Sequence, residues 1–190
     1  ELVRLGCEYI QLDAPHYPLL LDPTYRDFYA SRGWPAERWL DLGLELDNIV
    51  FGQRPGVTFG FHLCRGNQQS RWLVEGGYDW LAQHVRGGTG AERLLLEYDD
   101  ERSGGFEPLA AVPQDKTVVL GLVTTKNGRQ ETVDELKMRI QEAARYMPLE
   151  RLALSPQCGF ATSILGNALT VADEQAKLRT IVATAERVWG

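Results

Sequence analysis

The stretch TVVLGLVTTKNGRQETVDELKMRIQEAARYM, residues 117–147, places an apolar run shortly before an amphipathic segment. The run TVVLGLV at 117–123 is almost continuously apolar, which is typical of a strand buried on both faces in a parallel sheet. The segment 132–147 begins with Thr132 and carries Glu135 three positions later, the spacing of a helix-capping box. A buried strand followed by a capped helix predicts one βα unit.

The same alternation extends along the rest of the chain. The other runs expected to be strands are 7–13, 57–63, 93–98 and 151–155, and the other segments expected to be helices are 35–50, 68–86 and 171–189. In the helix that Pro35 opens, Trp39, Leu42 and Leu46 are expected to share one apolar face. Strands alternating with helices predict an α/β fold, either a doubly wound sheet or part of a (β/α)8 barrel. No glycine-rich phosphate-binding motif follows the first run, which counts against a nucleotide-binding variant.

The composition narrows the class of protein. The chain has 190 residues, a formal net charge of −6 at pH 7, three cysteines and three histidines. An acidic chain without a basic cluster is not typical of proteins that bind nucleic acid or anionic membranes. No apolar run approaches the roughly 20 residues of a membrane span, and the first residues show no signal-peptide pattern. Three scattered cysteines argue against a disulfide framework, so we expect a cytoplasmic protein without nucleic-acid or membrane partners.

The side chains of chemical interest gather at the carboxyl ends of the expected strands. They are Asp13, His62, Cys64, Glu97 and Cys158. In a (β/α)8 barrel these strand ends converge on one face, where active sites are built. The chain is expected to have five βα units whereas a (β/α)8 barrel has eight, so a complete barrel would need about three further N-terminal units. Residues 1–190 are then expected to form the C-terminal part of a single catalytic barrel domain.

His62 and Cys64 lie two positions apart, so on a strand their side chains point to the same side and can bind one ion. Zinc accepts imidazole nitrogen, thiolate sulfur and carboxylate oxygen, usually as four ligands in a tetrahedron. Glu97 and Cys158 offer a carboxylate and a second thiolate, at separations that suit ligands gathered from successive strand ends rather than a zinc finger. The alternative is that both cysteines are small buried residues and that His62 only forms a hydrogen bond.

Six collinear segments carry a resemblance to a known family. They are YIQLDAP at 9–15, FHLCRGN and EGGYDWLA within 61–82, LLLEYDDERSGGFEPL at 94–109, LGLVTTKNGRQETVDELKMRI at 120–140 and PLERLALSPQCGFAT at 148–162. The chain resembles the C-terminal catalytic barrel of cobalamin-independent methionine synthase, and more closely the short single-barrel relatives that include epoxyalkane:coenzyme M transferase. The resemblance implies a (β/α)8 barrel, of which this chain supplies about the last five βα units. It also implies a zinc ion, Zn2+, held by His62, Cys64, Glu97 and Cys158.

The implied activity is transfer of a methyl or other alkyl group from a donor to a thiol. Coordination to zinc removes the proton of the thiol and leaves a nucleophilic thiolate. In the methionine synthase branch, which serves methionine biosynthesis, the methyl group would pass from a folate to homocysteine, whose amino group Asp13 would contact. In the coenzyme M branch the thiolate would open an epoxide.

One departure from the family bears on mechanism. Full-length methionine synthase has a proton-donating histidine in the segment that reads LVTTKNG here, at 122–128, and this segment has no histidine. The catalytic proton donor is therefore left unassigned, and the short relatives are favoured over folate-dependent methionine synthesis. Lys126 in this segment is either a contact for an anionic substrate group or a solvated loop lysine.

A hypothesis from a different class rests on the same count of five units. The chain could be a non-catalytic barrel fragment, or a subunit that a missing N-terminal segment or another chain completes. An open barrel exposes two strand edges and part of its apolar interior, and both favour association. Measurement of bound zinc separates the two hypotheses, because the enzyme requires zinc and the non-catalytic fragment or subunit does not.

Overall fold

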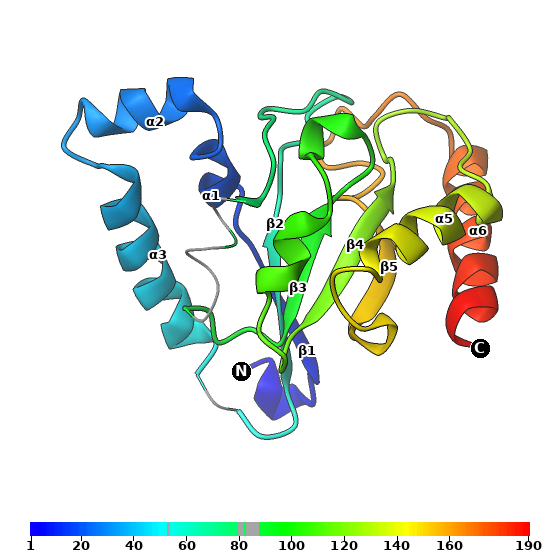
Figure 1. Ribbon diagram of the computed structural model, residues 1–190, viewed down its shortest axis with the longest axis horizontal. Coiled ribbons are helices and arrows are strands. Elements are labelled where there is room, and N and C mark those ends of the chain that lie inside the picture. The colour runs from blue at the N-terminus through cyan, green and yellow to red at the C-terminus, as the bar shows by residue number, and fades with distance from the viewer. Residues whose placement is uncertain (53, 80–81, 83–87) are drawn as a thin grey trace.

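The computed structural model describes residues 1–52, 54–79, 82 and 88–190. At its centre lies a five-stranded sheet in which all neighbouring strands run parallel (Figure 1). The strands are β1 Tyr9–Asp13, β2 Thr58–Leu63, β3 Arg93–Glu97, β4 Thr117–Val123 and β5 Leu152–Pro156. Each strand matches a run expected from the sequence to within about two residues, the usual uncertainty of element ends. The five strand predictions are confirmed.

The order of the strands decides between the two α/β alternatives. The strands neighbour one another in chain order, β1-β2-β3-β4-β5, with no reversal. A doubly wound sheet reverses its order at a switch point, whereas a barrel adds each new strand beside the previous one. The chain is therefore an α/β protein of the (β/α)8 type that supplies five consecutive parallel strands of the barrel.

Helices flank the sheet and connect its strands. The α-helices are α1 His16–Leu19, α2 Pro23–Ala30, α3 Ala36–Val50, α5 Val133–Ala143 and α6 Val171–Trp189, and the short 3-10 helices are η1 Val3–Leu5, η2 Glu101–Ser103, η3 Glu107–Ala111 and η4 Leu149–Arg151. Figure 1 places α2 and α3 to the left of the sheet and α5 and α6 to its right. The predicted capping box is confirmed, because Thr132 Oγ1 accepts from the Glu135 amide at 3.2 Å and Glu135 Oε2 accepts from the Thr132 amide at 2.7 Å.

The helix expected at 68–86 is wrong over its first half. Residues 68–77 contain no helix, and Gln68 pairs with Arg71 in an isolated antiparallel bridge. Gln69 and Ser70 have φ values of 51° and 66°, in the left-handed region that ends a regular helix. Most of the second half, including Trp80 and His84, lies outside the described residues.

The apolar face predicted for α3 is present, but it is not the face that the helix buries in the core. The helix buries Leu40 and Leu44, whereas Leu42 is 38% exposed and Leu46 is 56% exposed. Two apolar stripes run along this helix, and spacing alone does not say which stripe meets the core. Trp39, Leu42 and Leu46 instead line an apolar groove of about 500 Å³ between α2 and α3.

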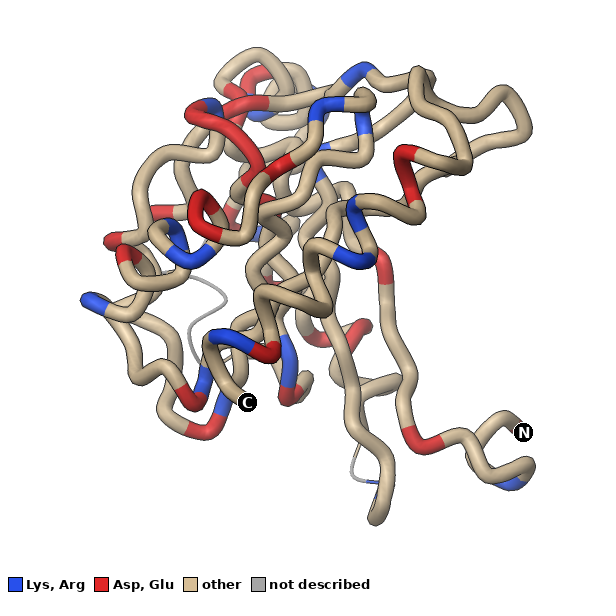
Figure 2. Tube along the Cα trace, turned by 90° about the vertical axis from the view of Figure 1, so that its right-hand side faces the viewer, with Lys and Arg blue, Asp and Glu red and all other residues tan. Residues whose placement is uncertain are grey.

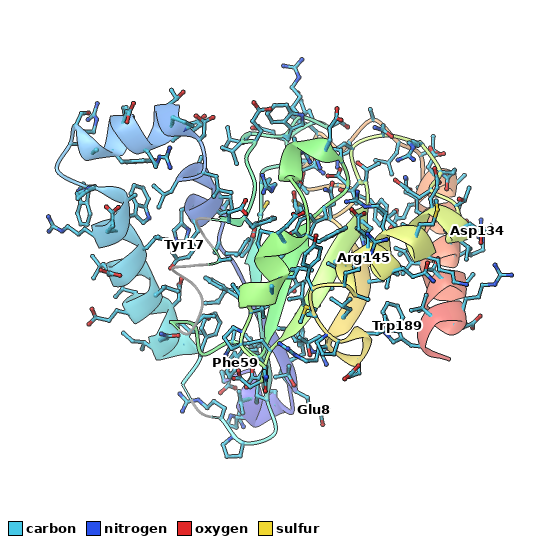
Figure 3. All side chains as sticks on the ribbon, in the orientation of Figure 1. Glu8, Tyr17, Phe59, Asp134, Arg145 and Trp189 are labelled. Atoms are coloured by element: carbon cyan, nitrogen blue, oxygen red, sulfur yellow. The ribbon has the colours of Figure 1, made fainter. Side chains whose placement is uncertain are left out.

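Tyr17 fastens the helical segment after β1 to the sheet. Its ring packs edge-on against Phe61 with centroids 5.4 Å apart, and its hydroxyl donates to Asp47 on α3 at 2.6 Å. Figure 3 shows Tyr17 between α3 and the sheet. This contact holds α3 close to the strand that carries His62.

Charged residues of both signs are spread along the chain. Figure 2 shows Lys and Arg interspersed with Asp and Glu over most of the trace. None of the helices among the described residues combines the length and apolarity that a membrane crossing needs.

Candidate metal centre

Four side chains capable of binding a metal meet at the carboxyl end of the sheet. They are His62 on β2, Cys64 just beyond β2, Glu97 at the end of β3 and Cys158 two residues beyond β5. One ligand atom of each residue lies within 4.8 Å of all the others. The structure thus brings together side chains that stand far apart in the sequence, because parallel strands all end at the same edge.

The contacts within this cluster are short and polar. Cys64 Sγ lies 3.1 Å from Cys158 Sγ, and Cys158 Sγ lies 2.7 Å from Glu97 Oε1. His62 Nε2 lies 3.4 Å from the same Glu97 oxygen. The four ligand groups therefore face a common point, as residues do when they share one ion.

The charges of His62 and Glu97 depend on each other. Burial lowers the pKa of His62, but hydrogen bonds to Asp13 and Glu97 and the charge of Cys64 raise it to about 10. Burial raises the pKa of Glu97, yet the hydrogen bond from His62 and the charge of Lys126 outweigh it and hold this pKa below its usual value. The imidazole of His62 and the carboxylate of Glu97 therefore each stabilise the charged form of the other.

The two cysteines share a proton unequally. The hydrogen bond from Cys158 lowers the pKa of Cys64, whereas that contact, together with burial and the charge of Glu97, raises the pKa of Cys158. Cys64 therefore loses its proton more readily than Cys158 does. A metal ion in this position would take the place of the remaining protons, because metal ligands bind in their deprotonated forms.

The donor set fits a metal ion on physical grounds. The side chain of Glu97 is 1% exposed, and its Oε2 atom has no hydrogen-bond partner among the residues that the structure describes. A buried carboxylate oxygen without a partner is costly unless a cation satisfies it. Two sulfurs, one imidazole and one carboxylate could hold such a cation, so the cluster is a candidate metal centre.

Asp13 lies beside this cluster rather than within it. The residue pairs with His62 across β1 and β2, and its Oδ1 atom lies 3.2 Å from His62 Nδ1. A carboxylate on Nδ1 fixes the ring orientation and leaves Nε2 free to bind a metal. The sequence places Asp13 at a strand end, but it does not reveal this contact, because the register of β1 against β2 is not readable from the pattern.

Tyr78 supports the cluster from behind, a role that nothing in the sequence pattern signals. Its buried hydroxyl accepts from the Glu97 amide at 3.0 Å and donates to the Leu63 carbonyl at 3.3 Å. The Arg65 guanidinium lies 4.2 Å from the centre of the Tyr78 ring. The phenol therefore bridges the ends of β2 and β3, which carry three of the four ligands.

A polar cavity of about 230 Å³ opens onto the cluster. Its polar lining residues are Gln11, His62, Glu97, Ser155, Gln157 and Cys158. Three of the four residues of the cluster, His62, Glu97 and Cys158, therefore face this cavity.

Lys126 does not behave as a solvated loop lysine. The residue is 6% exposed, and its Nζ atom lies 3.3 Å from Asp99 Oδ2 and donates to Gln157 Oε1. Both partners are close in sequence to residues of the cluster, Asp99 to Glu97 and Gln157 to Cys158. The alternative that the sequence left open as a solvated lysine is wrong.

Comparison with curated proteins finds relatives that align with nearly the whole chain. The uncharacterised proteins YxjG and YxjH of Bacillus subtilis (strain 168) are 45% and 41% identical to the chain over 186 residues, which is 97% of this chain and 49% of each relative. The chain spans about half the length of the curated relatives it matches.

Solved structures agree on the fold. A candidate vitamin-B12 independent methionine synthase of Listeria monocytogenes superposes with a TM-score of 0.75 and 28% identity, over 99% of this chain and 50% of the other. A B12-independent methionine synthase of Shewanella sp. W3-18-1, in complex with selenomethionine, gives a TM-score of 0.73 at 18% identity over 98% and 50%, which shows the fold alone.

The family model described as "Cobalamin-independent synthase, Catalytic domain" matches residues 91–187. This range contains β3, β4 and β5, and with them Glu97 and Cys158 of the cluster. Because the match extends over half of the chain, the protein belongs to the catalytic-domain family of the cobalamin-independent synthases.

Proposed function

We propose that the protein is a zinc-dependent transferase that moves a methyl or related alkyl group onto the sulfur of a thiol substrate. The observation that carries the proposal is the cluster of His62, Cys64, Glu97 and Cys158, whose ligand atoms lie within 4.8 Å of one another. Membership of a synthase catalytic-domain family supports transfer of a methyl group as the reaction class.

Zinc is the metal that suits this donor set. Two thiolates favour soft or borderline ions and count against Mg2+ and Ca2+, which prefer oxygen ligands. Zinc combines with sulfur, nitrogen and carboxylate oxygen in one tetrahedral site. Glu97 is the weakest ligand for such a site, and is the natural residue to withdraw when a substrate sulfur arrives.

The residues around the centre have separate tasks in this proposal. Bound zinc would supply the positive charge that keeps a substrate thiol deprotonated at neutral pH. Asp13 holds the His62 ring in position and stands at the edge of the site, where it can meet the ammonium group of an amino-thiol. In the transfer, the sulfur–carbon bond forms as the bond between carbon and the donor breaks. The leaving atom of the donor keeps the electron pair of that bond and takes up a proton from solvent, which balances the proton that the thiol releases.

The same site would serve epoxide opening by the thiolate of coenzyme M. The geometry of the four ligands does not depend on the alkyl donor, so this reaction stays within the proposal as an alternative. A panel of thiols and donors, assayed for the alkylated thiol product, separates the two reactions.

Association with further polypeptide is also part of the proposal. Among the described strands, β1 and β5 each pair on one side only, and unpaired strand edges favour pairing with other chains. A segment or partner chain that closes the barrel would satisfy both edges. A barrel unit that acts only inside such an assembly, with no reaction of its own, is the alternative.

The first experiment is elemental analysis of the purified protein together with its intact mass. About one zinc per chain is expected for a single four-ligand site. The zinc is then replaced by Co2+, and thiols are titrated in while the sulfur-to-cobalt charge-transfer absorption is followed. An increase of this absorption on adding thiol supports thiol binding at the metal, whereas a folded protein with reduced cysteines and no metal affinity contradicts the proposal.

Changing Asp13 to alanine separates its two possible tasks. If Asp13 mainly orients His62, the variant is expected to bind zinc about 10- to 100-fold more weakly, the usual cost of losing such an outer-shell partner. If Asp13 mainly contacts the substrate ammonium, zinc affinity is retained and only thiols with an amino group bind more weakly. Chelator competition measures the first effect, and titration of matched thiols with and without an amino group measures the second.

A further inference from the structure

Strand β4 provides no residue to the metal cluster, although it lies between the ligand-bearing strands β3 and β5. The residues at its carboxyl end nevertheless contact the segments that follow all three ligand-bearing strands. Thr125 Oγ1 accepts from Asn67 Nδ2 at 2.9 Å, and Asn67 lies three residues after Cys64. Lys126 reaches the other two segments. The end of β4 is therefore placed to set how these segments sit relative to one another.

Lys126 joins the segments that carry Glu97 and Cys158. Its Nζ atom lies 3.3 Å from Asp99 Oδ2, beyond the end of β3, and donates to the carboxamide oxygen of Gln157, directly before Cys158. The side chain of Asp99 is 2% exposed and that of Lys126 is 7% exposed. One buried ammonium thus connects the ends of β3 and β5, the two strands that lie on either side of β4.

The surroundings hold this ammonium in place. Arg102 lies 2.9 Å from the other oxygen of Asp99, so the buried carboxylate is shared by two cations. A charged hydrogen bond in a buried setting is strong, and its partners are expensive to separate. The segment is anchored from behind as well, because the Thr124 amide donates to Glu131 Oε1 at 3.1 Å.

We propose that Lys126 is a positioning residue of the metal centre, which holds Glu97 and Cys158 at the separation that metal binding requires. The inference rests on the proposed function only in that the four residues bind a metal. Lys126 itself does not touch the ion. Its removal leaves the four ligands present but loosens the relative positions of two of them.

The test compares two buried lysines at opposite ends of β4. Lys126→Met removes the ammonium at the carboxyl end, and Lys116→Met removes the one at the amino end. Lys116 is 8% exposed, and its Nζ atom donates to the Thr89 carbonyl at 2.9 Å. Nine residues lie between the two lysines, and seven of them form β4, a strand roughly 20 Å long. Each variant loses one buried positive charge from a position that flanks this strand.

Zinc affinity is measured by chelator competition, and the ligand field is measured by the absorption of the Co2+-substituted protein. Lys126→Met is expected to weaken zinc binding about 10- to 100-fold and to alter the intensity and position of the cobalt bands. Lys116→Met is expected to keep the zinc affinity and the cobalt absorption bands of the unchanged protein. Lys126→Arg, which keeps a buried cation with several donors, is expected to recover part of the affinity.

Two outcomes overturn the inference while leaving the proposed function intact. In the first, Lys126→Met has the zinc affinity of the unchanged protein, and its Co2+-substituted form has the same absorption spectrum. In the second, both lysine variants lose affinity equally, which indicates a general loss of stability. If Lys126→Met fails to fold, Gln157→Met removes only the link to the Cys158 segment, and unchanged affinity and cobalt spectrum in that variant also count against the inference. An unchanged protein without metal affinity would instead refute the proposed function.

Discussion

Replacing Cys158 with serine is expected to abolish most zinc binding and all alkyl transfer. The cysteine belongs to a cluster in which its sulfur lies 3.1 Å from Cys64 Sγ and 2.7 Å from Glu97 Oε1. Serine is nearly the same size, but its hydroxyl does not deprotonate readily and is a poor ligand for zinc. Loss of a direct ligand should cost more than the 10- to 100-fold that outer-shell changes cost, so we expect a decrease in affinity of more than about 100-fold.

The third cysteine provides the matched control. Cys7 is half-buried, and its thiol donates to the backbone carbonyl of Tyr9 on the first strand, away from the cluster. Cys7→Ser is expected to bind zinc and transfer alkyl groups as the unchanged protein does. Zinc content from elemental analysis, affinity from chelator competition and product from a thiol alkylation assay are compared in both variants. Full activity in Cys158→Ser would refute the assignment of this residue.

The strands were predictable because their pattern is local. A nearly continuous apolar run such as 117–123 has few alternatives to a buried parallel strand, and its neighbour 132–147 carries its own start signal in Thr132 and Glu135. The structure confirms both, although α5 ends at Ala143. The end of a helix depends on the packing of the next segment, which is weakly encoded in the pattern.

The side chains of the candidate metal centre were predictable as candidates for the same local reason. The spacing of His62 and Cys64 places them on one side of a strand, and strand ends converge in any parallel barrel. What surrounds them was not predictable. The contact of Asp13 with His62 depends on the register between two strands, and the burial of Lys126 depends on the position of Asp99 across the sheet.

The segment after β2 shows where pattern reasoning fails. Its apolar and aromatic residues suggested a helix from 68, but the backbone at Gln69 and Ser70 adopts left-handed values and forms a tight turn. Tyr78 in the same segment extends to the ends of β2 and β3 instead of lying along a helix face. Tertiary contacts with the strand ends outweigh local propensity in this segment.

Lys177 on α6 provides the second prediction with a large effect. Its side chain is fully buried, and its Nζ atom lies 2.8 Å from Glu131 Oε2 and donates to the Arg129 carbonyl. The side chain of Glu131 is 5% exposed and also accepts the Thr124 amide. Removing one partner of a buried ion pair leaves an uncompensated charge, so Glu131→Gln is expected to lower the free energy of unfolding by about 3–5 kcal/mol.

Thermal and denaturant unfolding measure this effect. A loss of that size corresponds to a decrease in Tm of roughly 6–20 °C for a chain of this length. Lys137 on α5 is exposed, so Lys137→Met is a matched control that should unfold at nearly the temperature of the unchanged protein. Glu131→Gln with an unchanged Tm would show that the pair contributes little to the packing of α6.

The double variant Glu131→Gln with Lys177→Met tests the cause of the loss. If the cost of the single changes is the unpaired buried charge, removing both charges should recover much of the stability, since buried pairs gain little over neutral packing. The coupling between the two positions follows from the four unfolding free energies. Additive losses would instead mean that each side chain acts through its own contacts, Glu131 with the Thr124 amide and Lys177 with the Arg129 carbonyl. Recovery in the double variant would therefore assign the loss in the single variants to the unpaired buried charge.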